Sequence, residues 1–165
     1  MPSDVNMDLD TVRRYINEQT PESKFYIGCD SDTHRRKDGR FYGTFVSVLV
    51  IHKNGNNGCK LFGKVEIEPI FINNGNHNLR LMTEVYKAAE LYTHLEDVLK
   101  DRKVEIHLDI NPDSMHKSHI ILSQATGYIR GVCGIIPKIK PDAFAASYAA
   151  DRLIKVKSEF PALYA

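Results

Sequence analysis

The chain has 165 residues, of which 42% are hydrophobic, and a formal net charge of +1. This length suits one domain with a sizeable core, which we expect to span residues 1–165, with residues 1–22 as an N-terminal helical extension. The charge excludes a polycation, so attraction to nucleic acid must come from local patches. Three widely spaced cysteines and the lack of any apolar run of ~18 residues predict a cytoplasmic protein with no membrane partner.

The N-terminal half predicts one helix and then an antiparallel meander. Leu9, Val12 and Ile16 have helical spacing, which indicates a helix over residues 8–18. Apolar, β-branched and aromatic runs separated by turn residues then indicate strands, and a basic turn begins at His34 between the first two of them. The three strands expected here cover about residues 24–30, 41–52 and 60–72.

The C-terminal half predicts alternating helices and strands. A long helix has an apolar stripe from Leu81 to Leu99, a later helix stops at Gly131, and a closing helix begins at Asp142 after Pro141. Because helical crossovers join parallel strands, strands four and five should lie parallel to strand one. The predicted fold class is α/β, with a mixed five-stranded sheet flanked by helices. The later elements cover about residues 104–110, 116–130, 132–139 and 142–157.

Aspartates close two of these strands. Asp30 and Asp32 end the first strand and project from one face because they are two residues apart, and Asp109 ends the fourth. Since several buried carboxylates are costly without a cation, their joint placement indicates a divalent metal site. A turn or cap residue is the alternative for each aspartate by itself. His107 is either a neighbour of the metals or a hydrogen-bonded interior histidine.

The order of elements, with these acids at strand ends, resembles the ribonuclease H-like fold. Four segments resemble, more closely, the YkuK family of ribonuclease H-like proteins. The resemblance spans about residues 24–155 and implies the fold more strongly than the reaction. The segments are IGCDSDTH, RLMTEVYKA, HLDINPDSMHKS and IKPDAFAASYAADRL.

The resemblance implies four catalytic carboxylates. Asp30 and Asp109 match the metal-ligating aspartates of the first and fourth strands. Glu84 matches the glutamate of the crossover helix, and Asp142 matches the acid of the final helix. In ribonuclease H such acids hold two Mg²⁺ or Mn²⁺ ions about 4 Å apart, which activate water and stabilise the leaving 3′-oxygen. Asp32 departs from the family pattern and is an extra metal ligand or a supporting group.

Two of these acids also have ordinary interpretations. Glu84 could be a solvated helix residue that pairs with Arg80 or Lys87. Asp142 could simply favour the positive end of a helix. Asp151 is nine residues further on, about half a turn out of phase and ~13 Å along the helix axis, so we expect it to lie away from the metals.

Basic residues flank the predicted acidic site. They follow the first strand and precede the closing helix, so positive charge would surround the carboxylates and suit a phosphodiester backbone. A solvated hairpin tip is the alternative for the first group. The residues predicted to bind nucleic acid are His34, Arg35, Arg36, Lys37, Lys138 and Lys140.

These observations predict a metal-dependent nuclease with a two-metal-ion mechanism. Its substrate would be RNA, an RNA/DNA hybrid or structured DNA, and the free edge of the third strand could support a homodimer. One alternative is a catalytically silent ribonuclease H-like module that binds nucleic acid or protein. Another is a haloacid-dehalogenase-type phosphatase, but His34 stands where that D-x-D motif wants Thr or Val, and the meander does not suit its doubly wound sheet.

Overall fold

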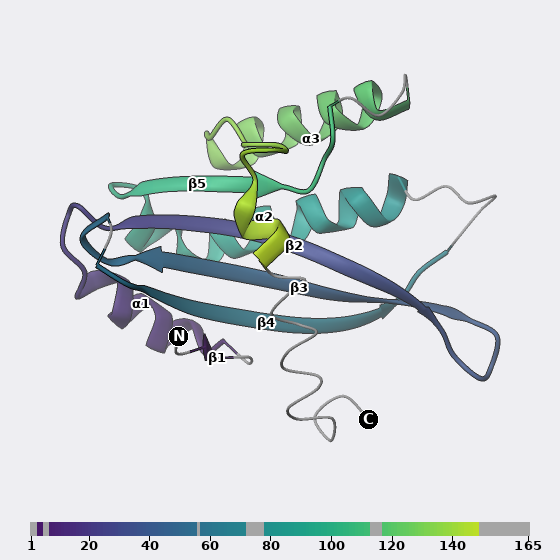
Figure 1. Cartoon of the computed structure of the whole chain (residues 1–165), viewed down its shortest axis with the longest axis horizontal. Helices are drawn as coiled ribbons and strands as arrows, with labels where there is room; N and C mark the ends of the chain where they lie inside the picture. Colours follow the sequence, from purple (N-terminus) through teal and green to yellow (C-terminus); the bar gives the residue numbers. More distant parts are fainter. Residues whose placement is uncertain (1–2, 5–6, 56, 72–77, 113–116, 149–165) are drawn as a thin grey trace.

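The protein is built on one β-sheet with helices packed against it (Figure 1). In this computed structural model the described parts of the chain are residues 3–4, 7–55, 57–71, 78–112 and 117–148. Within these parts, no helix is long and apolar enough to cross a membrane. The helices and strands are β1 (Ser3–Asp4), α1 (Leu9–Asn17), β2 (Lys24–Arg35), β3 (Phe41–His52), the 3-10 turn η1 (Lys53–Gly55), β4 (Cys59–Pro69), α2 (Asn78–Leu99), β5 (Lys103–Leu108) and α3 (Lys117–Cys133).

The four long strands have the order β4-β3-β2-β5, and the two-residue β1 pairs parallel with β4 at the edge. The predicted antiparallel meander is confirmed by β2, β3 and β4, and β5 lies parallel to β2 as expected. The edge of β4, which we expected to be free, is covered in part by β1 and by the Met7 amide, which donates to the Gly63 carbonyl at 3.1 Å. The mixed α/β fold class is therefore confirmed.

The third helix is longer than predicted. We expected it to stop at Gly131, but α3 continues to Cys133. Gly134, with φ of 68°, follows it in the left-handed conformation that glycine adopts just after a helix. Part of the segment predicted as strand five is therefore helical.

The prediction of a fifth long strand at residues 132–139 is wrong. After α3 the chain returns beside β5, where the Lys138 amide donates to the Ile106 carbonyl at 2.8 Å. The contact amounts to a single parallel bridge between His107 and Lys138. Pro137 and Pro141 lie on either side of it and have no amide hydrogen with which to extend a ladder. The segment has the position of a fifth strand without its pairing.

The core fills both faces of β2 because its side chains alternate. Phe25 and Ile27 are fully buried in the main core with residues of α1, α2 and α3. Tyr26 points to the other face and packs in a smaller cluster with Val48 and Ala145. Full burial of such side chains stabilises the fold by roughly 1.5–3 kcal/mol each. The central strand is thereby fixed from both sides.

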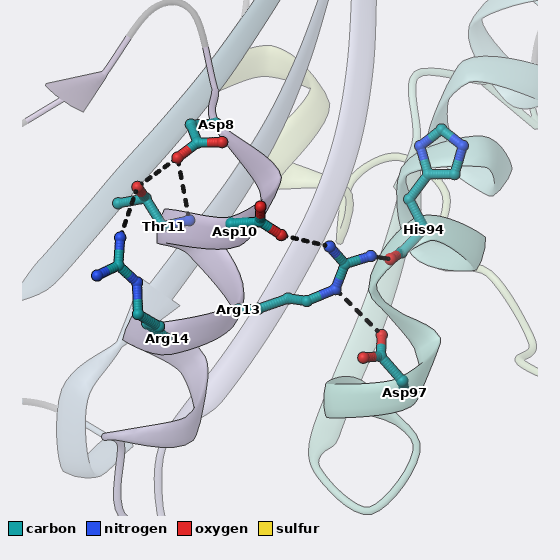
Figure 2. A network of polar contacts seen from close by, with 7 residues as sticks. All are labelled: Asp8, Asp10, Thr11, Arg13, Arg14, His94 and Asp97. Atoms are coloured by element: carbon teal, nitrogen blue, oxygen red, sulfur yellow. Dashed lines mark hydrogen bonds and ion pairs between the residues drawn. The ribbon is translucent and has the colours of Figure 1, made fainter.

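Polar contacts hold α1 against α2 (Figure 2). Asp8 caps the N-terminus of α1 by accepting a hydrogen bond from its first turn. Arg13 reaches α2, where Nη2 donates to the His94 carbonyl at 2.5 Å and Nε donates to Asp97 at 3.4 Å. The N-terminal helix is therefore tied to the helix that crosses the sheet.

The last described helical turn, residues 144–148, lies against β2 on the face opposite α2 (Figure 1). Gly28 permits this approach, because a Cβ there would meet the Ala146 nitrogen at 2.6 Å and the Ala145 carbonyl carbon at 2.8 Å. The closing helix predicted from Asp142 begins two residues later. Its predicted continuation past residue 148 lies outside the described residues.

Candidate active site

A difference in length between β2 and β5 creates an open site in the sheet. The pairing of β2 with β5 stops at Cys29, opposite Leu108, while β2 itself continues to Arg35. Asp30 is thus the first residue of β2 without a neighbour on β5, and Asp109 follows the end of β5 directly. The expectation that strand one ends near Asp30 is wrong, but the parallel pairing ends there. The two aspartates consequently lie at one break in the sheet.

Helix α2 brings Glu84 near enough for the charges of both aspartates to act on it, and we call Asp30, Glu84 and Asp109 the carboxylate notch. Glu84 is 4% exposed, and its Oε1 accepts a hydrogen bond from Ser31 Oγ at 2.5 Å. Arg80 Nη1 lies 3.5 Å from the same oxygen and donates to Ser31 Oγ at 2.9 Å. Burial raises the pKa of Glu84 to about 8, against the hydrogen bond from Ser31, and the charges of Asp30 and Asp109 add to the rise.

The charge of Asp109 also acts on Asp30. Burial raises the pKa of Asp30 to about 6; the Ser31 amide, which donates to its Oδ1 at 2.9 Å, lowers it, and the charge of Asp109 raises it. Asp109 forms an ion pair with Lys140 Nζ at 2.6 Å, and this contact raises the pKa of Lys140. The charges of Asp30 and Glu84 act on Lys140 in the same direction.

The donor set of the notch suits a hard divalent cation. Carboxylate oxygens are the ligands that Mg²⁺ and Mn²⁺ prefer. Arg80 Nε is buried without a hydrogen-bond partner in the described part of the chain, so the polar groups here are incompletely satisfied. Among the described residues, no three Asp, Glu, His or Cys side chains are spaced to hold a metal ion. Two carboxylates of the notch are instead paired with cations of the chain, Asp109 with Lys140 and Glu84 with Arg80. A metal bound through Asp109 Oδ1 would therefore have to displace Lys140.

Asp142, implied as the fourth acid, is exposed and acts on His107. Burial lowers the pKa of His107, and the charge of Asp142 opposes that shift. The buried His107 ring accepts a hydrogen bond from the Ala145 amide at Nδ1, at 3.1 Å, and its Nε2 lies 3.1 Å from Glu105 Oε2. Of the two interpretations of His107, the structure supports a hydrogen-bonded interior histidine. Asp151 lies outside the described residues.

The basic residues predicted to bind nucleic acid form two groups. Residues 34–37 make the end of β2 and the tip of the β2–β3 hairpin, which extends past the end of β5 (Figure 1). The expected turn begins only at Arg36, because the two residues before it still pair with β3. Lys138 and Lys140 are exposed on the segment beside β5, and Lys140 reaches the carboxylate notch.

A second group of charges surrounds the buried Lys87 further along α2, and we call it the Lys87 cluster. Lys87 is 7% exposed, and its Nζ lies 2.9 Å from Glu66 Oε2 and 2.6 Å from Glu68 Oε1. Lys64 completes the cluster at 3.0 Å from Glu66 Oε1. A cavity of about 120 Å³ opens beside it, between β4, α2 and the chain before α1.

Sequence reasoning missed two residues that shape the carboxylate notch. Ser31 lies between two aspartates on a strand, so alternation alone directs it to the opposite face, toward α2. Arg80 was considered only as a surface partner of Glu84, whereas it contacts a buried carboxylate and the Ser31 carbonyl. Asp32 shares the face of Asp30 and is exposed.

A family model described as Ribonuclease H-like matches residues 8–155. The chain belongs to the ribonuclease H-like family. The match and the antiparallel β2–β3–β4 meander contradict the phosphatase alternative, which requires a doubly wound parallel sheet.

Among curated proteins, this ribonuclease H-like protein is similar to the uncharacterized protein YkuK of Bacillus subtilis (strain 168). The two are 27% identical over 151 residues, which cover 84% of each chain. The resemblance to the YkuK family is thereby confirmed. No solved structure gives a match to the chain.

Proposed function

We propose that this ribonuclease H-like protein is a Mg²⁺- or Mn²⁺-dependent nuclease that hydrolyses phosphodiester bonds. The observation that carries the proposal is the excess of acid in the notch: three carboxylates stand against two cationic side chains, Arg80 and Lys140. Burial and repulsion raise the pKa of Asp30 and of Glu84. Titratable groups held at such an electrostatic cost gather at functional sites.

The reaction that we propose needs no protein nucleophile. Two bound ions would supply an activated water and stabilise the leaving 3′-oxygen. Asp32 would support these ions from the exposed face of β2. The acids that would hold them are Asp30, Glu84, Asp109 and Asp142.

The other residues of the site act by orientation and charge. Ser31 and Arg80 hold one oxygen of Glu84, so the carboxylate is oriented before any ligand arrives. Lys140 neutralises Asp109 in the metal-free protein. Once it leaves Asp109, its ammonium group is close enough to the notch to meet a phosphate of the substrate.

The proposed substrate is nucleic acid, as RNA, an RNA/DNA hybrid or structured DNA. Support comes from the basic residues on two sides of the notch, at the hairpin tip (34–37) and at Lys138 and Lys140. We further propose that the protein acts in the cytoplasm. A homodimer formed through the β4 edge would use the part of that edge that β1 leaves uncovered.

A second candidate function is a catalytically silent module that binds nucleic acid or protein. One specific observation favours it: the chain's own cations already stand against Asp109 and Glu84, at 2.6 Å and 3.5 Å. In a silent module these ion pairs would replace the metals permanently. The two candidates differ in whether divalent ions bind at all.

Metal-dependent thermal stability separates them. Mg²⁺ or Mn²⁺ should raise the melting temperature of the wild type, because a ligand that binds only the folded state stabilises it. Asp30→Asn and Asp109→Asn should each remove much of that gain. Asp30→Asn should leave the metal-free protein as stable or more stable, since it relieves carboxylate repulsion, whereas Asp109→Asn also removes the ion pair with Lys140.

Glu66→Gln is the matched control, because Glu66 is an acid of the neighbouring Lys87 cluster. It should keep the full metal response. Equal responses in the wild type and both aspartate variants would favour the silent module. Cleavage assays on single strands, duplexes, hybrids and branched DNA would then define the substrate of a protein that does bind metal.

A further inference from the structure

The tip of the β2–β3 hairpin carries two stacks of arginine on an aromatic ring. The Arg36 guanidinium lies 4.0 Å from the centre of the Tyr42 ring, and the Arg35 guanidinium lies 5.8 Å from that of Phe41. His34 pairs with Tyr42 across the strands and stacks beside it at 6.2 Å and 23°. Since neighbouring residues of a strand alternate, the two stacks lie on opposite faces of the hairpin.

Only the Tyr42 stack shares a face with the acids of β2. The side chains of Asp30, Asp32 and His34 are each two residues apart along β2 and therefore lie on one face of the strand. His34 is the cross-strand partner of Tyr42. The register is uninterrupted, so Asp30 and His34 are roughly 13 Å apart at ~3.3 Å per residue. One short oligonucleotide could therefore contact both the notch and the stack of Arg36 on Tyr42.

The cations of the tip are not neutralised by nearby acids. Within the described parts of the chain, no carboxylate forms an ion pair with Arg35, Arg36, Lys37 or Arg40. Asp38 is instead engaged in the turn, where it accepts a hydrogen bond from the Arg40 amide at 2.9 Å. The tip thus presents unpaired positive charge beside the exposed Phe41 ring and the partly buried Tyr42 ring.

Planar cations and aromatic rings together are the means by which proteins hold unpaired bases. Bases that are not stacked in a duplex can lie on Tyr, Phe or His rings and on the plane of Arg. A duplex keeps those base faces covered, so it can use the charge of the tip but not its rings. The combination therefore favours a single strand.

We propose that Tyr42 and Arg36 form a base-stacking subsite that holds an unpaired nucleotide of the strand reaching the carboxylate notch. The inference rests on the proposed nuclease function and deepens it by naming the substrate class: nucleic acid that is single-stranded next to the cleaved bond. The Arg35 stack on Phe41 points to the other face and does not contribute.

The test measures binding in the presence of a chelator, so that cleavage plays no part. The probes are a short single-stranded oligonucleotide, its duplex and an abasic strand of the same length. Tyr42→Leu should weaken single-strand binding about 5- to 100-fold, the range for one lost base stack. It should leave the salt dependence, the duplex affinity and the abasic-strand affinity unchanged, because none depends on stacking.

Three variants make the result specific. Tyr42→Phe should bind like the wild type, because the ring remains. Arg36→Lys should lose affinity for the single strand while keeping the salt dependence of binding, since lysine retains the positive charge but lacks the planar guanidinium group. Phe41→Leu is the matched control on the opposite face and should bind normally.

The inference is overturned if Tyr42→Leu binds the single strand like the wild type, if it loses abasic-strand affinity equally, or if Phe41→Leu has the same effect. A wild type that binds none of the probes overturns it together with the proposed nucleic-acid substrate. Binding that depends on Tyr42 without metal-dependent cleavage supports the subsite and overturns the nuclease proposal alone.

Discussion

Helix α2 carries two buried charged residues three positions apart, and their surroundings differ. Lys87 meets two glutamates of β4, one of which also contacts Lys64, so two acids balance two cations. Glu84 lies among three acids that only Arg80 and Lys140 oppose. The Lys87 cluster is balanced in charge, whereas the carboxylate notch has one acid in excess.

The difference follows from position in the sheet. The Lys87 cluster lies over continuous pairing of β3 and β4, where Glu66 and Glu68 share a face and both reach the lysine. The notch lies where β5 ends and the edge of β2 is uncovered. The Lys87 cluster needs no ligand because its charges balance, whereas the excess of carboxylate in the notch is relieved either by a proton on Glu84 or by a cation. The comparison therefore separates a structural ion-pair group from a candidate ligand site on the same helix.

The largest effect should come from removing an acid of the notch. Asp30→Asn or Asp109→Asn should reduce metal-dependent cleavage by more than about 100-fold, because loss of residues that merely support a metal ligand already costs 10–100-fold. Initial rates on a single-stranded substrate would measure this. Glu66→Gln, the control from the Lys87 cluster, should cleave normally. A similar loss in Glu66→Gln would remove the distinction between the two regions.

A comparable loss of cleavage should identify the fourth metal-binding acid, which we expect to be Asp142. Asp142→Asn should abolish most cleavage, whereas Asp151→Asn should retain most of it and change mainly stability. Rates and melting temperatures of the two variants would be compared at saturating Mn²⁺. The opposite pattern would mean that the notch recruits its last acid from further along the closing helix.

The pH dependence of stability without metal should differ in sign between the two regions. The pKa of Glu84 is raised to about 8, so between pH ~4.5 and ~8 the folded state holds a proton that the unfolded state lacks. Stability should therefore fall as the pH rises through this window, by at most ~1.4 kcal/mol per pH unit from this group. Glu84→Gln should flatten that decline in chelator-treated protein, measured by urea unfolding.

Glu66 provides the opposite case, because its contacts with Lys87 and Lys64 outweigh burial and lower its pKa. Its contribution should be present at neutral pH and be lost only as the pH falls below ~4.5. Glu66→Gln should therefore change the acid limb of the stability profile and leave the decline between pH 4.5 and 8. The same decline in Glu84→Gln as in the wild type would contradict the assignment of the raised pKa.

The smallest effect should come from removing the central cation of the Lys87 cluster. Lys87→Met keeps the packing of the stem and should cost about 1 kcal/mol of folding stability. The cost is small because the side chains of Glu66 and Glu68 are 28% and 44% exposed and can be hydrated. Cleavage and the metal response should not change. A loss of metal binding in this variant would show that the two regions are coupled.

Local pattern predicted most of the fold because it depends on residues close in sequence. The period of β2 and β3, the apolar stripe of α2 and the positions of Asp30, Glu84 and Asp109 could all be read from spacing and resemblance. The fifth strand could not, because Pro137 allows a β-like sequence only one bridge. Ser31 and Arg80 were missed since their roles depend on which face of β2 meets α2.

By itself the sequence determined which acids are present, which of them alternate on one strand face and where the helices and main strands lie, since these depend on periods of 2 and 3.6 residues. Tertiary structure alone decided that β2 extends beyond the end of β5, that Lys140 contacts Asp109 and that the Arg36 guanidinium lies over the Tyr42 ring. The physical reason is that burial and charge balance depend on neighbours far apart in the chain. Packing therefore made Glu84 a group with a raised pKa and left Lys87 as part of a neutral cluster.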